Sequence, residues 1–426
     1  MKKAFWVLRA GCWVLAAWCC GLGAGSAFAQ APIRTVDFPT ALREAVEKNP
    51  TIGQAALAVT RADALVAQAR SLMVPSAQLA VTNTTLDSAR GFAGGITQPQ
   101  NQFAFSGNVR YAVGGWIDVA QARDQRLVAT AASAEAKQGV AIAAAQAYLA
   151  VIASRRQVEV IDRSLATARA HYEYADRRFG AGVGSGLNRL RAGQLVTSAE
   201  LQLEGARLSL RRAQEALGVA LASDGPVDAG AEPTFDAPGV SDTASWTTVR
   251  PDLVTEAAIR RAAERVVKDH WRDWAPLPVL SFDPQIVTPS GLFQPARTWR
   301  FTVSMVQPLF DGGQRRATLR LRQAAVEESK LAFANIEIRA RSEIRIAQES
   351  LASLERSLAS ARSAVAQATS VLQITTTAFE VGATTNIEVI DAQRSLRDAE
   401  TAVTQVEDAA RRARLELLIA VGRFPG

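Results

Sequence analysis

The chain repeats itself with an offset of about 200 residues, and this duplication constrains its fold more than any other feature. Six positions around one turn have equivalents 200 residues later in the chain. The pairs are Phe179 with Phe379, Gly182 with Gly382, Ser185 with Thr385, Leu187 with Ile387, Leu190 with Ile390, and Ala192 with Ala392. Three further pairs lie at offsets of 201 or 198: Pro50 with Pro251, Pro75 with Pro276, and Gly114-Gly115 with Gly312-Gly313. Few insertions separate the copies, which indicates that one supersecondary unit was duplicated and that both halves share a fold.

The first 29 residues have the pattern of a secretory signal peptide. Lys2, Lys3 and Arg9 form a positive region, an apolar stretch follows, and Ala27-Phe28-Ala29 fits the small-residue cleavage rule. An uncleaved membrane anchor is the alternative, but the apolar core is short for a spanning helix. We therefore expect a signal peptide at residues 1–29 and an exported chain from Gln30.

Cysteine content and charge exclude several classes of protein. Cys12, Cys19 and Cys20 all lie in the predicted signal peptide, so the exported part has no disulfide, thiolate metal site or cysteine nucleophile. Without that peptide, 45 basic residues face 41 acidic ones, interleaved along helical stretches. This pattern indicates a solvated surface, and no nucleic-acid partner is expected.

Each half reads as helix, strand, loop, strand, very long helix, turn and helix. The predicted units are the first repeat at 30–222, a connector rich in Pro, Gly, Asp and Ser at 223–249, and the second repeat at 250–426. Helices are expected at 40–72, 118–178, 187–221, 314–378 and 387–421. A helix of about 60 residues is roughly 90 Å long. The abundance of alanine and glycine in these helices favours close packing in a hollow helical wall over a solid coiled-coil rod.

The period of apolar residues changes from helical to two at four places. Strands are expected at about 77–85, 102–113, 278–287 and 298–308. One face of each is apolar or aromatic, which is typical of barrel strands with lipid outside and water inside. The lipid-facing candidates are Phe103, Phe105, Tyr111, Trp299, Phe301 and Val303. Half-buried strands of a soluble sandwich are the alternative for any one of these segments.

Four strands per chain are too few to close a barrel. A strand edge in lipid leaves backbone groups unpaired, each at a cost of several kcal/mol. The chain is therefore expected to oligomerise so that several protomers share one barrel, and three protomers would supply twelve strands. The predicted fold class is mostly α with a small β part, assembled as a homotrimer with a shared 12-stranded β-barrel on a long α-helical barrel.

At this point the sequence resembles the TolC-like outer-membrane efflux and secretion channels over nearly all of its exported part. The resemblance is carried by five segments in order: 41–50 (ALREAVEKNP), 74–76 (VPS), 177–186 (RRFGAGVGSG), 307–313 (QPLFDGG) and 377–386 (TAFEVGATTN). It implies a passive conduit in the outer membrane of a Gram-negative cell that extends into the periplasm. The implied partners are outer-membrane lipid, a periplasmic adaptor (membrane fusion) protein and an inner-membrane pump or ABC exporter, in a tripartite efflux pump or type I secretion system.

The resemblance also implies a periplasmic mouth near the second turn. Glu388 and Asp391 stand where family members carry acidic residues in a pore constriction, and three copies of each would form a ring that favours cations. Ordinary acids at a helix N-terminus are the alternative. The family's charged latch is replaced here by Phe379, Thr384 and Asn188, so we expect a mouth held mainly by packing or held less tightly, with Arg189 and Arg191 as alternative partners for the two acids.

The two turns are the expected adaptor-docking sites. Their candidate residues are Gly182, Ser185, Gly382 and Thr385. Both glycines are expected at positive φ in a sharp reversal. A helix-capping glycine that contacts no partner is the alternative for either turn taken alone, and the duplication of the turn weakens that alternative.

Competing functions are weaker. His171 and His270 lie on helical stretches without metal-ligand spacing and read as polar helix surface, and no catalytic motif appears, so no enzyme, metal or cofactor is expected. An exported structural or adhesive coiled-coil protein is the main alternative, but it would need sustained heptads and no mid-chain strands. A substrate-specific porin would need many more strands per chain. The sequence leaves the cargo open, whether drug or polypeptide, and does not favour metal ions because His and Met are scarce.

Overall fold

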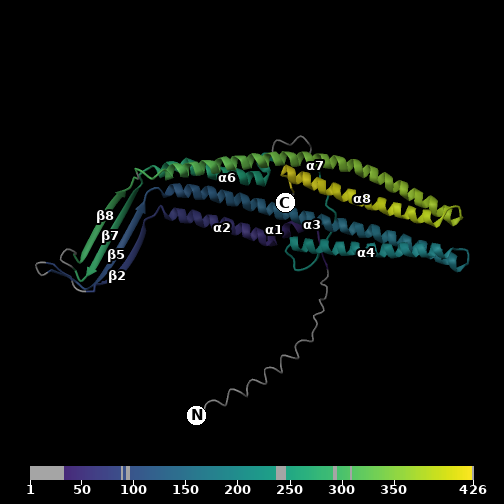
Figure 1. The fold of residues 1–426 in the computed structure, drawn as a ribbon, viewed down its shortest axis with the longest axis horizontal. Coiled ribbons are helices and arrows are strands. Elements are labelled where there is room, and N and C mark those ends of the chain that lie inside the picture. Colours follow the sequence, from purple (N-terminus) through teal and green to yellow (C-terminus); the bar gives the residue numbers. More distant parts are fainter. Residues whose placement is uncertain are drawn as a thin grey trace, which may run out of the picture.

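The computed structural model describes residues 33–87, 90–92, 96–236, 246–290, 295–307 and 309–424. The predicted signal peptide lies outside the described residues. The described part is mainly helical with a small sheet fraction, which confirms the prediction of a mostly α chain with a small β part. It is a long, thin molecule with the sheet at one end and two helical hairpins at the other (Figure 1).

The first repeat contains α1 (Phe38–Lys48), α2 (Pro50–Ser71), β2 (Ser76–Thr85), β5 (Asn101–Ala112), α3 (Gly115–Gly180) and α4 (Gly186–Ala220). The second contains α5 (Trp246–Val249), α6 (Pro251–Lys268), the 3-10 helix η2 (Asp269–Asp273), β7 (Pro278–Thr288), β8 (Arg297–Met305), α7 (Gln314–Glu380) and α8 (Asn386–Val421). The expected strand ranges, 77–85, 102–113, 278–287 and 298–308, overlap β2, β5, β7 and β8.

The helix expected at 40–72 is two helices, which corrects the prediction. Pro50 forces the preceding residue into extended backbone, and Asn49 has φ −68° and ψ 124°. The Asn49 Oδ1 then accepts a hydrogen bond from the Thr51 amide at 2.9 Å, which caps α2. The second repeat uses the same device, because Arg250 is extended before Pro251 at the start of α6.

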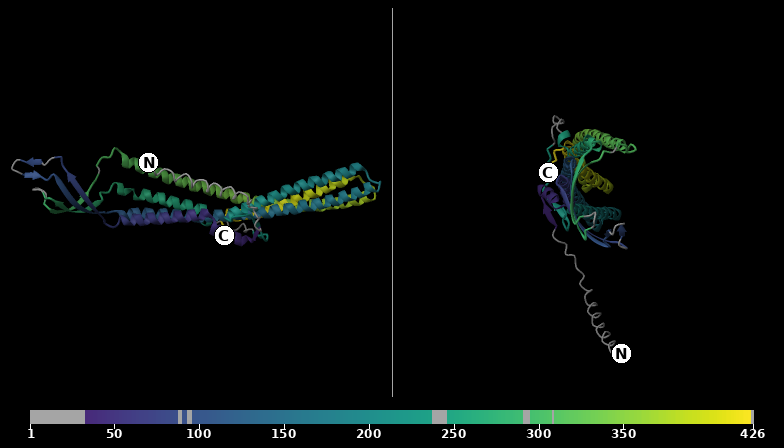
Figure 2. Two further views of the ribbon diagram at one scale, coloured as in Figure 1. Left: turned by 90° about the horizontal axis from the view of Figure 1, so that it is seen from below. Right: turned by 90° about the vertical axis from the view of Figure 1, so that its left-hand side faces the viewer.

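The helices form one bent layer and not a closed bundle (Figure 2). Near the sheet the packing order is α2, α3, α6, α7, and towards the hairpin turns it is α4, α3, α8, α7. The long helices α3 and α7, of 66 and 67 residues, run through both halves of this layer. Each is accompanied by two shorter helices placed end to end (Figure 1).

The main core lies at the middle of the layer, where the two halves meet. Short strands β1 (Arg34–Val36) and β6 (Val227–Ala229) pair in parallel and cover α3 there. The apolar stretch of α3 around Tyr148 packs in this core against α1, α4 and β6. Among the described residues, one helix, α3, is long and apolar enough to cross a membrane by length and composition, but its apolar stretch contributes to this core.

The sheet order is β2-β5-β7-β8, antiparallel throughout, so β2 and β8 are its edges. A separate pair, β3 (Arg90–Phe92) with β4 (Ile96–Gln98), lies in the loop between β2 and β5. The sheet is open within one chain: β2 and β8 are not paired with each other among the described residues.

Candidate functional site: sheet faces, conduit wall and hairpin tips

The four-stranded sheet has one apolar and one polar face. The register aligns Val81 with Phe105, Phe105 with Ile286, and Phe282 with Phe301, so these side chains share a face. All six lipid-facing candidates fall on it: Phe103, Phe105, Tyr111, Trp299, Phe301 and Val303. Trp299 is 72% exposed and Tyr111 is half-buried, so the chain leaves most of this face uncovered.

The opposite face of the sheet carries polar side chains in register. Asn108 donates a hydrogen bond from Nδ2 to the Asp283 carboxylate, and Asp283 is aligned with Arg300 on β8. Gln78, Thr82, Ser106, Ser281 and Thr302 lie on the same face. A sheet with one exposed apolar face and one hydrogen-bonding face suits a boundary between lipid and water.

The middle of the helical layer also has two unlike faces. On one, the Tyr148 hydroxyl donates to the Ala231 carbonyl at 2.8 Å, and Arg155 Nη2 lies 2.6 Å from Asp228 Oδ1. These contacts fix β6 and the segment that follows it on this side of α3. Successive residues of a helix are rotated by about 100° around its axis, so Ser154 and Gln157 of α3 point away from the face that carries Tyr148 and Arg155.

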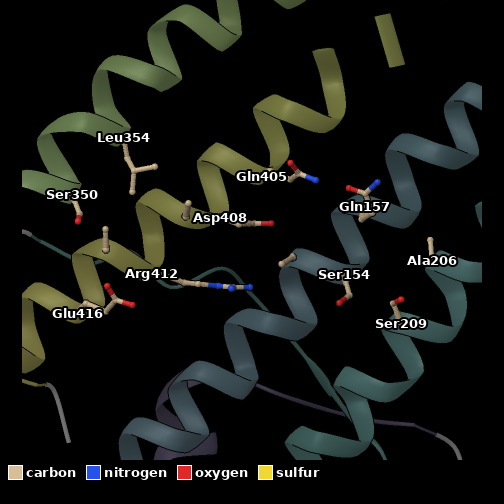
Figure 3. Close-up of a pocket in the computed structure, with 13 residues that line it drawn as sticks. Ser154, Gln157, Ala206, Ser209, Ser350, Leu354, Gln405, Asp408, Arg412 and Glu416 are labelled. Atoms are coloured by element: carbon tan, nitrogen blue, oxygen red, sulfur yellow. The ribbon is translucent and has the colours of Figure 1, made fainter. Parts of the chain in front are cut away.

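That opposite face holds a recess of about 600 Å³ that spans α3, α4, α7 and α8 (Figure 3). Eight of its thirteen lining residues are polar or charged: Ser154, Gln157, Ser209, Ser350, Gln405, Asp408, Arg412 and Glu416. Figure 3 shows Asp408 and Arg412 of α8 pointing across the gap towards α3. A recess of this lining is suited to water and polar solutes.

Ion pairs on the side of β6 hold α3, α7 and α8 together. The Glu407 carboxylate accepts hydrogen bonds from Arg156 Nη1 at 2.7 Å and from Arg362 Nη2 at 2.9 Å. Glu232 in the segment after β6 pairs with both Arg156 and Arg411. Burial acts to raise the pKa of Glu407, but the two arginines outweigh it and the pKa lies below its usual value.

The two hairpin turns have the same backbone geometry. Gly182 and Gly382 adopt φ of +71° and +78°, as expected for the duplicated glycines. The following residues, Val183 and Ala383, donate to carbonyls five residues earlier, at 3.1 and 2.8 Å, which is the Schellman arrangement. The Ser185 hydroxyl accepts from the Leu187 amide at 3.2 Å, whereas Thr385 occupies the equivalent N-cap without a side-chain bond.

Phe379 is buried between the two hairpins, with 8% of its surface exposed. Its ring centroid lies 5.7 Å from that of Tyr174 and 5.8 Å from that of His171, both on α3. The Arg178 guanidinium lies 5.7 Å from the Phe379 ring centroid. The position where the resemblance implies a latch residue is therefore a packed aromatic contact.

A chain of hydrogen bonds lies beside this contact. His171 Nε2 is 2.7 Å from Asn386 Oδ1, and Asn386 Nδ2 donates to the Asn188 carbonyl at 3.4 Å. His171 and Asn386 are 8% and 3% exposed. The interpretation of His171 as polar helix surface is thus wrong, because the fold buries it at the seam of α3 and α8. Burial lowers its pKa from 6.5, opposed by the hydrogen bond to Asn386.

His270 is also not simple helix surface. Its Nε2 accepts from Trp274 Nε1 at 2.8 Å, and its Nδ1 lies 3.2 Å from the Asp273 carboxylate. This cluster lies where the helices join the sheet. Both histidines therefore serve structural contacts that residue spacing did not reveal.

The acidic candidates at the second turn are exposed. Glu388 accepts a hydrogen bond from the Thr384 hydroxyl, and Asp391, 67% exposed, lies 3.9 Å from Arg394. The alternative pairing expected for Arg189 is wrong within one chain, because Arg189 Nε lies 2.7 Å from Asp176 Oδ1. Among the described residues, no ion pair joins Arg191 to Glu388 or Asp391.

The sequence did not single out His171 with Asn386, or Arg250 with Glu343. The members of each pair lie 215 and 93 residues apart in sequence. No motif marks them, and only the fold brings them together. Within the described ranges, no group of three or more His, Cys, Asp or Glu side chains has a geometry that could hold a metal ion.

Known proteins share this architecture. The chain is 24% identical to outer membrane protein OprJ of Pseudomonas aeruginosa over 318 residues, which is 72% of this chain and 65% of that relative's length. The outer membrane protein VceC of Vibrio cholerae superposes with a TM-score of 0.79 at 19% identity, covering 90% of this chain and 96% of VceC. The CmeC outer membrane channel of Campylobacter jejuni gives 0.80 at 16% identity, covering 91% of this chain and 86% of CmeC.

The family assignment follows from the match to a family model. The model described as outer membrane efflux protein matches residues 41–223 and 250–423, so it covers both repeats and leaves out the connector. The neighbours in sequence and structure are outer-membrane proteins and channels, which favours a channel over the alternative of an exported coiled-coil protein. The chain therefore belongs to the outer membrane efflux protein family, and its place is the outer membrane.

Proposed function

We propose that three copies of this chain form one conduit through the outer membrane and periplasm. The observation that carries the proposal is that every layer of the chain is open along the same two sides. The sheet ends in β2 and β8, and the helical layer ends in α2 and α4 on the side of β2 and in α7 on the side of β8. One rotation therefore pairs all the open edges at once, which is the condition for a closed ring.

Exposed apolar side chains on these edges support the ring. They are Leu57 and Leu65 on α2, Leu201 and Leu208 on α4, and Leu331, Ile338, Ile346 and Ile374 on α7. Burial of apolar area stabilises association by roughly 25 cal/mol per Å². The same rotation would join β8 to β2 of the next copy, so that three copies close a twelve-stranded barrel with Trp299 and Phe301 towards lipid.

The polar recess of the helical layer then faces the interior of the conduit. It lies opposite the segment after β6, which covers the other face. A wall of Ser, Gln and mixed charges lets polar cargo pass without binding it tightly. The chain contributes a passage and does no bond chemistry, and an inner-membrane pump or ABC exporter, joined by a periplasmic adaptor, would deliver the cargo.

The hairpin tips would form the periplasmic mouth. In the trimer, Glu388 and Asp391 would face the axis as a constriction, and the exposed turns at Gly182 and Gly382, with Ser185 and Thr385, would receive the adaptor. The contacts of Phe379, Asn188 and Thr384 within one chain contain no charged latch between the hairpins. A mouth held by packing and neutral hydrogen bonds is proposed.

Single-channel recording of the purified protein in planar lipid bilayers tests this function. The expected result is a discrete conductance that prefers cations. In the double variant Glu388→Gln, Asp391→Asn, the reversal potential in a KCl gradient should move towards zero. The matched control Asp398→Asn, an exposed acid farther along α8, should leave selectivity unchanged. Absence of any conductance from correctly inserted protein would contradict the proposal.

A further inference from the structure

The seam between the two hairpins contains one buried titratable side chain, His171. It lies on α3, three turns from the hairpin tip, and its only hydrogen-bond partner in the described structure is Asn386 at the start of α8. Ala168, Leu195 and Ile390 form an apolar cluster beside it. Any movement of the α7–α8 hairpin away from α3 must break the contact of His171 with Asn386.

The hydrogen bonds define which nitrogen carries the proton. Asn386 Nδ2 donates to the Asn188 carbonyl, which leaves Asn386 Oδ1 as the acceptor facing His171. The imidazole therefore donates from Nε2, and in the neutral ring Nδ1 has no proton. A proton added at Nδ1 would place a positive charge in the seam, where no described acceptor meets it.

No opposite charge from the surrounding helices compensates such a proton. On α3, Arg178 stacks on Phe379, and Asp176 is held by Arg189 of α4. On α8, Glu388 accepts from Thr384, and the exposed Asp391 lies near Arg394. The other charged residues at this end of the helices are Glu173 and Arg177 on α3, Arg191 on α4 and Glu380 on α7. The pKa of His171 accordingly responds only to burial and to Asn386.

We propose that His171 and Asn386 form a proton-sensitive clasp that holds the two hairpins together at neutral pH and releases them in mild acid. The proposal rests on the conduit and mouth proposed above. In the released state the imidazole is hydrated and titrates near its ordinary pKa of about 6.5. The clasped state has the lower pKa. The clasp is therefore at full strength above about pH 6.5 and weakens as the pH falls towards the clasped-state pKa.

The size of the effect follows from linkage. Each pKa unit between the two states shifts the equilibrium tenfold towards release at low pH. Three protomers close one mouth, so three clasps respond together. Open probability in bilayers should therefore rise steeply between pH 7.5 and 5.5 and change little above pH 7.5.

Two variants and a matched control test the clasp in the bilayer recordings. His171→Gln keeps a donor for Asn386 but does not titrate, so its open probability should not vary in this window. His270→Gln replaces the other histidine, at the sheet end, and should keep the wild-type response. Asn386→Asp sets a carboxylate against the imidazole, which raises the pKa of His171 in the clasped state above its value in the released state. The direction of the pH response is then reversed, and acidification to pH 5.5 should tighten the mouth.

A second readout detects the clasp without conductance. Cys12, Cys19 and Cys20 lie in the predicted signal peptide, so an introduced cysteine is unique in the exported chain. Ile390→Cys lies in the seam and Leu187→Cys is exposed on the turn. The reactivity of both thiols towards maleimide changes with pH. Dividing the labelling rate at residue 390 by the rate at residue 187 removes this common effect, so the ratio reports how accessible the seam is. It should rise from pH 7.5 to 5.5, by up to about tenfold per clasp for a released-state pKa of about 6.5, and the rise should vanish when His171→Gln is added.

The outcomes separate the two proposals. A conducting channel whose labelling ratio and open probability ignore pH, or respond equally in His171→Gln, overturns the clasp and leaves the conduit intact. A pH-dependent labelling ratio without conductance supports the clasp and contradicts the conduit. A wild-type response in Asn386→Asp, with no change of sign, also overturns the clasp.

Discussion

Phe379 shows how a single residue can decide how tightly the tip is held. Its ring fills the space between His171, Tyr174 and Arg178 at the seam of the hairpins. Phe379→Ala would leave a cavity, which typically costs about 3–5 kcal/mol for a buried phenylalanine. We expect a higher open probability in bilayers at neutral pH.

The duplication supplies the control for this prediction. Phe179 is the equivalent residue of the first repeat, but 42% of its surface is exposed, and the Arg189 guanidinium lies 5.4 Å from its ring centroid. Phe179→Ala should therefore change the open probability little. Equal effects of the two substitutions would show that the buried contact does not hold the seam.

At the residue scale, the sequence predicts the chemical character of a position better than it predicts which residues that position contacts. The alternation of aromatic residues placed Phe301 and Trp299 on one face of a strand, because the period of a strand is local information. The burial of His171 was missed, because it depends on Asn386, 215 residues away, and on helix packing that no local pattern encodes. The alternative pairing of Arg189 was wrong within one chain, where Arg189 pairs with Asp176 on the adjacent helix.

Among the elements, α7 begins at a cap that is specific to the second repeat. Asp311 accepts from the Gly313 amide and the Arg315 amide, both at 3.0 Å, and from Arg315 Nε at 2.6 Å. The Arg315 side chain, followed by the backbone amides, lowers the pKa of Asp311 to about 2. The cap is at full strength above about pH 3.8 and is lost as the pH falls towards 2.

We expect Asp311→Asn to lower the thermal unfolding temperature at pH 7, because the amide is a weaker acceptor for Arg315. Part of the wild-type loss of stability between pH 4 and 2 should be missing in this variant. Melting curves across this pH range measure both effects. Asp398→Asn, in an exposed part of α8, is the control that should reproduce wild type.

Arg250 joins three elements at the boundary between the connector and the second repeat. It pairs with Asp252 at 2.7 Å and with Glu343 of α7 at 2.9 Å, and it donates to the Ala420 carbonyl of α8 at 3.1 Å. Arg250→Leu leaves these acceptors without their donor, at a cost of about 1–3 kcal/mol. The measured unfolding temperature should fall, whereas Arg356→Leu, an exposed arginine on α7, should have little effect.

The elements themselves were largely predictable where the signal is local. Long Pro-free, Ala-rich stretches predicted α3 and α7, and the change of period predicted the positions of the four sheet strands. The break at Asn49-Pro50 was overlooked although a proline was visible, and the pairing of β1 with β6 was not foreseen. Three-residue strands carry no periodicity, and this pair forms because α3 offers it a buried surface.

At the scale of the whole molecule, the account depends on association along the open edges. Ile338 on α7 is exposed in the single chain, and the proposed ring would bury it against the next copy. Ile338→Glu would place a carboxylate in that interface and should shift trimer to monomer in detergent, measured by analytical ultracentrifugation. Ile338→Ala, which removes apolar area without adding charge, should weaken association much less.

Native mass spectrometry of the detergent-extracted protein tests the central claim most directly. If one chain cannot close its own sheet in lipid, the intact particle must contain three copies, and it must need detergent to stay in solution. The account predicts a single dominant species at three times the mass of the processed chain. A stable monomer that remains soluble without detergent would contradict it.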